Sequence, residues 1–104
     1  MPLQEMDQLN KTAKIKACDM VERNYFSHED PDGRMPWYLF IKMGVNYKYA
    51  GENIASGYTD SENEELVEDW MASPTHRKNI LNKEYQYMGI ATCGEYTVQH
   101  FGAL

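Results

Sequence analysis

The stretch AGENIASG, residues 50–57, decides how this chain of 104 residues is organised. It places a carboxylate, Glu52, and a carboxamide, Asn53, between two glycines near the middle of the sequence. His28 lies 24 residues before the glutamate and His76 lies 24 residues after it. Neither histidine has the local spacing of a helical metal pair, so any site that they share with Glu52 must be assembled by folding.

The composition favours one compact domain spanning residues 1–104, with 42% hydrophobic and 12% aromatic residues. Ten basic residues against sixteen acidic ones give a net charge of −6. This balance disfavours nucleic acid and anionic membrane surfaces as partners, because both are bound mainly by Lys and Arg.

Targeting and membrane signals are missing from the sequence, and its cysteines are few. The best apolar run, residues 37–41, is too short to cross a bilayer, and the first residues do not form a signal peptide. Cys18 and Cys93 are too few for a disulfide scaffold, and we expect free thiols. The alternative, a bridge between these residues 75 positions apart, would contribute about 4 kcal/mol in the loop-entropy model.

Apolar residues at helical spacing predict a first helix over about residues 5–23. Its buried stripe is Met6, Leu9, Ala13, Ala17 and Met20. We expect Lys11, Lys14 and Lys16 to be solvated, whereas Ile15 lies opposite the stripe on a second surface that needs a cover.

Turn residues and helix signals divide the rest of the chain. Residues 24–33 predict a loop that holds His28, followed by a short helix from Pro36 to Gly44 and a short extended or irregular segment around residues 47–57. The capping box at residues 61–64 starts a helix, and residues 73–75 end it and begin another that carries His76. The buried stripe of the first of these two helices is Leu66, Val67, Trp70 and Met71.

The end of the chain predicts a strand pair. Residues 87–92 and 95–101 flank Cys93-Gly94, which suits a two-residue turn. Helices around a small antiparallel sheet make an α+β layered domain.

His28, Glu52 and His76 are the candidate functional residues. Two imidazoles and one carboxylate suit an open zinc site, and the same three groups suit proton transfer with Glu52 as the base. All three can equally be structural, hydrogen-bonding the backbone or ordering turns. We expect His100, on the last strand, to be structural or exposed.

Four ordered motifs identify a resemblance over about residues 3–102. They are FSH at 26–28, GENIASG at 51–57, WMASPTHRKNIL at 70–81 and VQHFG at 98–102. Together they resemble the CAP superfamily of cysteine-rich secretory, antigen 5 and pathogenesis-related 1 proteins, and most closely its bacterial SCP-like extracellular branch.

The resemblance implies an α-β-α sandwich whose groove brings together two histidines and acidic residues and often binds a divalent cation such as zinc. His28, Glu52 and His76 match three members of that cluster. Many eukaryotic members have a second glutamate where this chain has Ser73, and Asp69 is the nearest carboxylate. The family's first helix has no counterpart here, so we expect the face bearing Ile15 to be exposed, self-associated or covered by a partner.

The resemblance implies a secreted or envelope-associated binding module, with zinc the expected metal at His28, His76 and Glu52. One alternative is a metal-assisted hydrolase of peptide or cell-wall material, in which Glu52 shuttles a proton and the histidines assist. Another is a carrier of lipid or sterol in an apolar groove. The expected partner is correspondingly a protein, a cell-wall component or a lipid.

Overall fold

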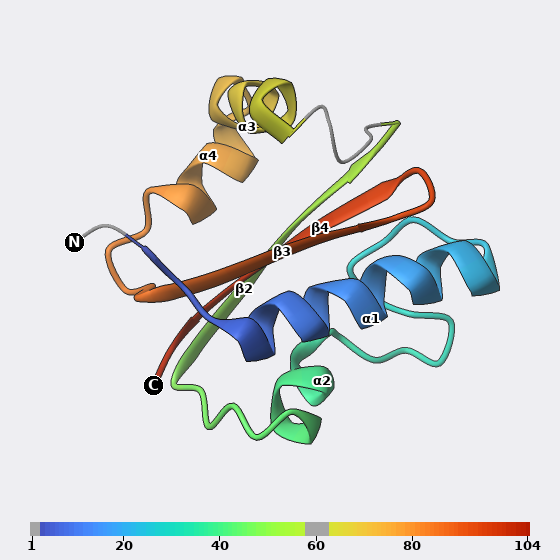
Figure 1. Cartoon of the computed structure of the whole chain (residues 1–104), viewed down its shortest axis with the longest axis horizontal. Helices are drawn as coiled ribbons and strands as arrows, with labels where there is room; N and C mark the ends of the chain where they lie inside the picture. The colour runs from blue at the N-terminus through green and yellow to red at the C-terminus, as the bar shows by residue number, and fades with distance from the viewer. Residues whose placement is uncertain (1–2, 58–62) are drawn as a thin grey trace.

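The computed structural model of the chain describes residues 3–57 and 63–104. Figure 1 shows the order of its elements along the chain. They are β1 (Gln4–Glu5), α1 (Asp7–Arg23), α2 (Trp37–Lys42), β2 (Tyr49–Ser56), α3 (Asn63–Ala72), α4 (Pro74–Ile80), β3 (Tyr87–Cys93) and β4 (Tyr96–Ala103).

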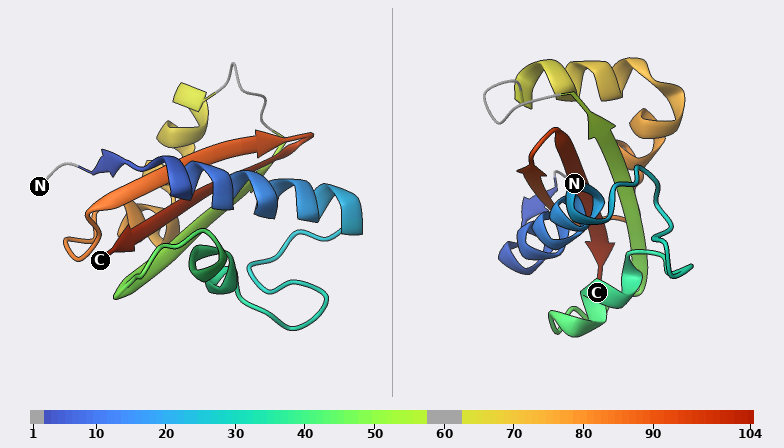
Figure 2. Two further views of the ribbon diagram at one scale, coloured as in Figure 1. Left: turned by 60° about the horizontal axis from the view of Figure 1, so that its bottom comes forward. Right: turned by 90° about the vertical axis from the view of Figure 1, so that its right-hand side faces the viewer.

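The strands form a sheet in the order β1-β3-β4-β2. The pairs β2–β4 and β3–β4 are antiparallel, and only the two-residue β1 runs parallel to its neighbour β3. Figure 2 shows the layers: α1 covers one face of the sheet, while α3 and α4 cover the other. The α+β class and the α-β-α sandwich predicted from the sequence are confirmed.

Helix α1 packs on the sheet through the predicted stripe. Leu9, Ala13, Ala17 and Met20 are fully buried, and Met6 is partly buried. The helix backbone approaches β3 so closely that a Cβ atom at Gly89 would overlap the backbone of Leu9 and Asn10. The glycine therefore sets the distance between helix and sheet.

On the opposite face, α3 buries Leu66 and Trp70 against β2, β3 and α4. The other two predicted members of its stripe are less covered: Met71 is half-buried, and Val67 is 40% exposed because the contact with the sheet is narrower than the stripe. The predicted capping box at residues 61–64 begins with Ser61, which lies outside the described residues.

Two predicted boundaries differ from the structure. The segment around Glu52 is an eight-residue strand, because β2 pairs with β4 from Tyr49 to Ser56. The hairpin turn is Gly94-Glu95, one residue later than predicted, and Gly94 adopts a left-handed φ of +58° there. Local sequence could not decide either point, since strand pairing fixes both.

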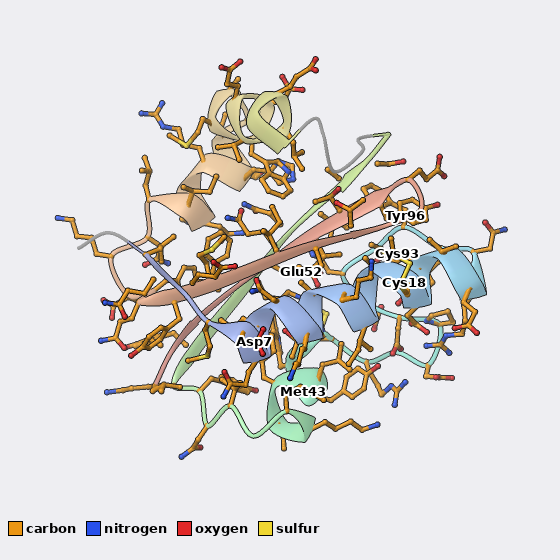
Figure 3. All side chains as sticks on the ribbon, in the orientation of Figure 1. Asp7, Cys18, Met43, Glu52, Cys93 and Tyr96 are labelled. Atoms are coloured by element: carbon orange, nitrogen blue, oxygen red, sulfur yellow. A yellow bond between two sulfur atoms is a disulfide. The ribbon has the colours of Figure 1, made fainter. Side chains whose placement is uncertain are left out.

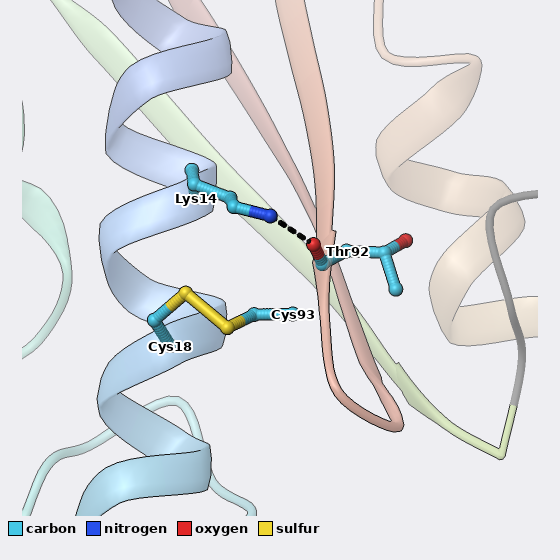
Figure 4. The surroundings of a disulfide bond; sticks show 4 residues. All are labelled: Lys14, Cys18, Thr92 and Cys93. Atoms are coloured by element: carbon cyan, nitrogen blue, oxygen red, sulfur yellow. Dashed lines mark hydrogen bonds between the residues drawn. A yellow bond between two sulfur atoms is a disulfide. The ribbon is translucent and has the colours of Figure 1, made fainter.

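The prediction of free cysteines is wrong. Cys18 of α1 and Cys93 at the end of β3 form a disulfide, shown in Figure 4. The two positions are far apart in the sequence, but α1 lies across β3 and brings their Cα atoms to 5.1 Å. The same contact lets Lys14 donate a hydrogen bond to the Thr92 carbonyl at 2.6 Å.

Two expectations from the sequence concern a membrane-spanning helix and the face of α1 that bears Ile15. Among the described residues, no helix has the length and apolar character needed to span a bilayer. Ile15, on the outer side of α1, is 41% exposed in the single chain.

Candidate functional site

The three predicted site residues lie around β2, the strand at one edge of the sheet. Glu52 is in the strand, His28 is in the loop that follows α1, and His76 is in α4. His28 Nδ1 is 2.7 Å from Glu52 Oε1. His76 lies beside the same strand, and its backbone carbonyl accepts a hydrogen bond from the Asn53 side chain at 3.2 Å.

Glu52 is buried, on the face of the sheet that α1 covers. Figure 3 labels it near the centre of the molecule. Its second oxygen, Oε2, lies 2.8 Å from Nε2 of His100, its partner in the β2–β4 register. Both carboxylate oxygens are thus occupied by imidazoles, one half-exposed and one fully buried.

The sequence did not identify His100 as part of this site. The expectation that His100 is exposed is wrong, because α1 and α2 cover it completely, and the expectation of a structural role stays a prediction. The signal that could have found it is the strand register, which places His100 directly opposite Glu52. That register follows from the whole hairpin and not from any local motif.

The prediction that Lys16 is solvated is also wrong, because this residue is only 2% exposed. Its side chain extends from α1 under the His28 loop, where Nζ donates to the His28 carbonyl at 2.8 Å and to the Tyr25 hydroxyl at 3.2 Å. Burial lowers the pKa of Lys16, while the negative charges of Glu52 and Asp30 oppose that effect. A lysine in this position compensates buried carboxylates, which explains why it is inside.

The loop that carries His28 is fixed by a second buried carboxylate, Asp30. Its Oδ1 accepts the backbone N–H groups of Asp32 and Arg34, both at 2.9 Å, and its Oδ2 accepts from Arg34 Nε at 3.0 Å. Burial alone would raise the pKa of Asp30, but the hydrogen bonds from Arg34 and Asp32 hold that pKa below its ordinary value. These hydrogen bonds therefore fix the conformation of the loop that carries His28.

The outer edge of β2 is capped by side chains instead of a further strand. Tyr85 donates to the Ala50 carbonyl at 3.1 Å, and Asn79 donates to the Glu52 carbonyl at 3.0 Å. The His76 ring hydrogen-bonds the backbone of Ile54, two residues further along the strand. Such capping protects an edge strand from pairing with another chain.

The capping contacts also hold the His76 ring. Its Nδ1 lies 2.9 Å from Oγ of Ser73, and the ring stacks on Trp70. Burial and the nearby His28 charge lower the pKa of His76, although the bond to Ile54 opposes the shift.

Charge states at the centre of the site follow from burial and hydrogen bonding. Burial alone would raise the pKa of Glu52, but the bonds from His100 and His28 and the charge of Lys16 outweigh it and lower that pKa. Burial lowers the pKa of His100 more than the bond to Glu52 raises it. At neutral pH the site therefore holds an ionised Glu52 and a neutral His100.

An apolar groove of about 280 Å³ lies beside His76. Its lining comes from the His28 loop, β2, α3 and α4, and consists of Phe26, Ile54, Ala55, Leu66, Asp69, Trp70, Ser73 and His76. A second hollow of about 310 Å³ is lined by residues around Met6, Val45 and Leu104 and contains no acidic or basic side chain. Of the two hollows, only the smaller one adjoins a predicted site residue, His76.

A zinc ion requires several donor side chains that converge on one point. Within residues 3–57 and 63–104, no group of three His, Cys, Asp or Glu side chains is arranged to hold an ion. Glu52 has no free oxygen and His76 is held at its ring, whereas His28 makes no hydrogen bond through Nε2 in the described part of the chain. A zinc site at the three predicted residues remains a prediction, and it requires His76 to release its present contacts.

Comparisons with known proteins agree on one family. The family model of the cysteine-rich secretory proteins (CAP) matches residues 1–101. Over 89 residues the chain is 44% identical to the uncharacterized protein YkwD of Bacillus subtilis (strain 168), covering 86% of this chain and 34% of YkwD. Over 83 residues it is 37% identical to the uncharacterized membrane protein YlbC of the same organism, covering 80% of this chain and 23% of YlbC.

Solved structures give the same result. An extracellular protein containing an SCP domain from Bacillus anthracis superposes with a TM-score of 0.88 at 29% identity, over 98% of this chain and 34% of that one. An outer surface protein from Borrelia burgdorferi superposes with a TM-score of 0.83 at 25% identity, over 98% of this chain and 77% of that one. The chain spans about a third or less of the two Bacillus subtilis relatives.

Proposed function

This chain belongs to the cysteine-rich secretory protein (CAP) family, and from that premise we propose that it is a secreted or envelope-associated binding module. Its binding site is the β2 edge between His28 and His76, together with the adjoining apolar groove. The solved structures of an extracellular and an outer surface protein support this location. The Cys18–Cys93 disulfide supports it independently, because disulfides persist mainly in oxidising compartments.

The observation that carries the proposal is the hydrogen bond between His28 and Glu52. An ionised carboxylate can only accept, so Nδ1 of His28 carries a proton, and in the neutral ring Nε2 then presents a lone pair. The side chain of His28 is 49% exposed, while the carboxylate fixes the ring. Metal-ligating histidines characteristically donate their second ring nitrogen to a carboxylate in this way.

A divalent cation is the ligand that this arrangement suits, and zinc suits imidazoles best. His28 Nε2 and the His76 ring would hold the ion, with Glu52 orienting His28 from behind. Zinc would supply a positive centre for an anionic group of the partner.

The same contacts favour binding over hydrolysis. A hydrolase of the predicted kind needs Glu52 to shuttle a proton from water. Both oxygens of Glu52 instead accept hydrogen bonds from imidazoles, inside the protein. The metal-assisted hydrolase stays an alternative, in which Glu52 would act through an oxygen that already accepts a bond from an imidazole.

The apolar groove favours a second candidate, binding of part of a lipid or sterol. Phe26, Leu66 and Trp70 give it apolar walls, and its volume of about 280 Å³ is below that of most pockets for whole drug-sized ligands. The groove would thus hold one end of such a molecule. Displaceable binding of a fluorescent sterol, weakened in Phe26→Ala, would support this candidate, and absence of saturable binding would eliminate it.

Zinc titration by calorimetry tests the first proposal. We expect micromolar or tighter binding by the native chain and none by a His28→Ala, His76→Ala double variant. Lys78→Ala, an exposed change on the same helix as His76, is the matched control and should bind as the native chain does. Equal binding by the double variant and the native chain would show that the two histidines are structural.

A further inference from the structure

A line of hydrogen bonds runs from the site into the interior of the protein, and His100 lies at its centre. Thr12 Oγ1 is 2.7 Å from His100 Nδ1, and His100 Nε2 is 2.8 Å from Glu52 Oε2. The other oxygen of Glu52 is 2.7 Å from His28 Nδ1. Thr12, His100 and Glu52 are all buried, so water is not available to replace a missing partner.

Proton counting gives these bonds a direction. The ionised carboxylate has no proton to donate, so His100 must donate from Nε2. A ring with one proton then accepts at Nδ1 from the Thr12 hydroxyl, which otherwise donates to the Leu9 carbonyl at 3.0 Å. A ring with two protons would make the same bond to Glu52, with Thr12 accepting, so this contact does not depend on the protonation of His100.

We propose that His100, braced by Thr12, is a positioning residue that holds the Glu52 carboxylate in the orientation in which it accepts Nδ1–H of His28. The inference rests on the proposed function, because it explains how Nε2 of His28 becomes the nitrogen available to a ligand. Phe40 packs against the His100 ring, with centroids 5.1 Å apart, and restrains it from the side of α2.

Glu52 needs such a restraint because a buried cation, Lys16, competes for it. The charge of the buried Lys16 acts on the carboxylate from the α1 side. Without a donor at Oε2, one buried oxygen would lack a partner, which is unfavourable. The carboxylate would then turn toward Lys16 and lose its aligned bond to His28.

The test is nitrogen-15 NMR of the imidazole rings, in the disulfide-bonded chain without ligand, at a mildly alkaline pH where the rings are neutral. We expect the native chain to have the Nδ1–H form of His28 and the Nε2–H form of His100. His100→Gln keeps a donor for Glu52 and should preserve the tautomer of His28. His100→Leu has no donor, and in this variant we expect the Nδ1–H form of His28 to lose its dominance.

A folded His100→Leu variant with an unchanged His28 tautomer would overturn the inference. Should that variant not fold, the native spectrum decides: His28 as the Nε2–H form, or His100 with its only proton on Nδ1, contradicts the proposal. The spectra contain no zinc, so their outcome is separate from that of the calorimetric titration. Native tautomers as expected, together with failed zinc binding, would preserve the positioning role and refute the metal site.

Discussion

Replacing Lys16 with methionine tests how the site is supported from within. The change keeps an unbranched chain of similar length and removes the ammonium group that donates to the His28 carbonyl and the Tyr25 hydroxyl. Lys11→Met is the matched control, because Lys11 lies on the same helix with its side chain 63% exposed and forms a surface ion pair with Asp7 at 3.3 Å.

The expected magnitude follows from the contacts of the two lysines. Each hydrogen bond from a buried charged group contributes about 1.5–3 kcal/mol. Removing the partner of a buried charge costs about 3–5 kcal/mol before the relief of lysine desolvation is subtracted. We therefore expect Lys16→Met to lower the free energy of unfolding by about 2–4 kcal/mol, and Lys11→Met by less than about 0.5 kcal/mol, as for exposed pairs.

Urea unfolding of the three disulfide-bonded chains, followed by far-UV circular dichroism, measures the difference. A loss of about 2–4 kcal/mol lowers the melting temperature by roughly 10 °C or more for a domain of this size. Equal midpoints for Lys16→Met and Lys11→Met would refute the conclusion that the buried ammonium supports the site.

Three further predictions concern the frame of the site. Replacing Cys18 and Cys93 by serine should cost about 4 kcal/mol, because the bridge closes 75 residues in the unfolded chain, and a change below about 1 kcal/mol in urea unfolding would contradict this. Gly89→Ala should cost more than about 3 kcal/mol, since the new methyl overlaps the α1 backbone; near-native stability would show that the helix moves away freely. The free energy of unfolding should fall as the pH drops below 6.5, because His100 takes up a proton in the unfolded chain more readily than in the folded one. It should fall further below pH 4.5, where the same holds for Glu52. Unfolding midpoints that stay constant from pH 7 to pH 5 would contradict the lowered pKa values of His100 and His76, and His100→Gln should weaken the upper phase.

Patterns within single elements were sufficient to predict the α+β class, whereas the α-β-α sandwich was implied by the resemblance to the CAP superfamily. The stripe of α1 follows from helical spacing, and all of its members except the partly buried Met6 are fully buried. The strand pair at the end of the chain was predicted from its flanking turn, within one residue of the observed turn. Such features depend on neighbours in the sequence, which is why they can be read directly.

Contacts between elements explain the features that could not be predicted from the sequence. Lys16 is expected outside by its chemistry and lies inside because Glu52 and Asp30 require a counter-charge. His100 enters the site through the strand register, and the disulfide forms because α1 crosses β3. Each depends on a partner far away in the chain.

Part of the candidate site was predicted and part was not. His28 and Glu52 were expected together and make direct contact. His76 lies beside the same strand but is held there by Ser73 and Ile54. The sequence could not show that Glu52 has both oxygens occupied, which changes its proposed role from metal ligand to orienting group.

A crystal structure of the chain soaked with zinc would locate the ion directly. We predict zinc bonded to Nε2 of His28 and to the His76 ring, with Glu52 still hydrogen-bonded to Nδ1 of His28 and to His100. Zinc bonded to the oxygens of Glu52, or bound elsewhere with His28 and His76 unchanged, would contradict the proposed binding site at the β2 edge.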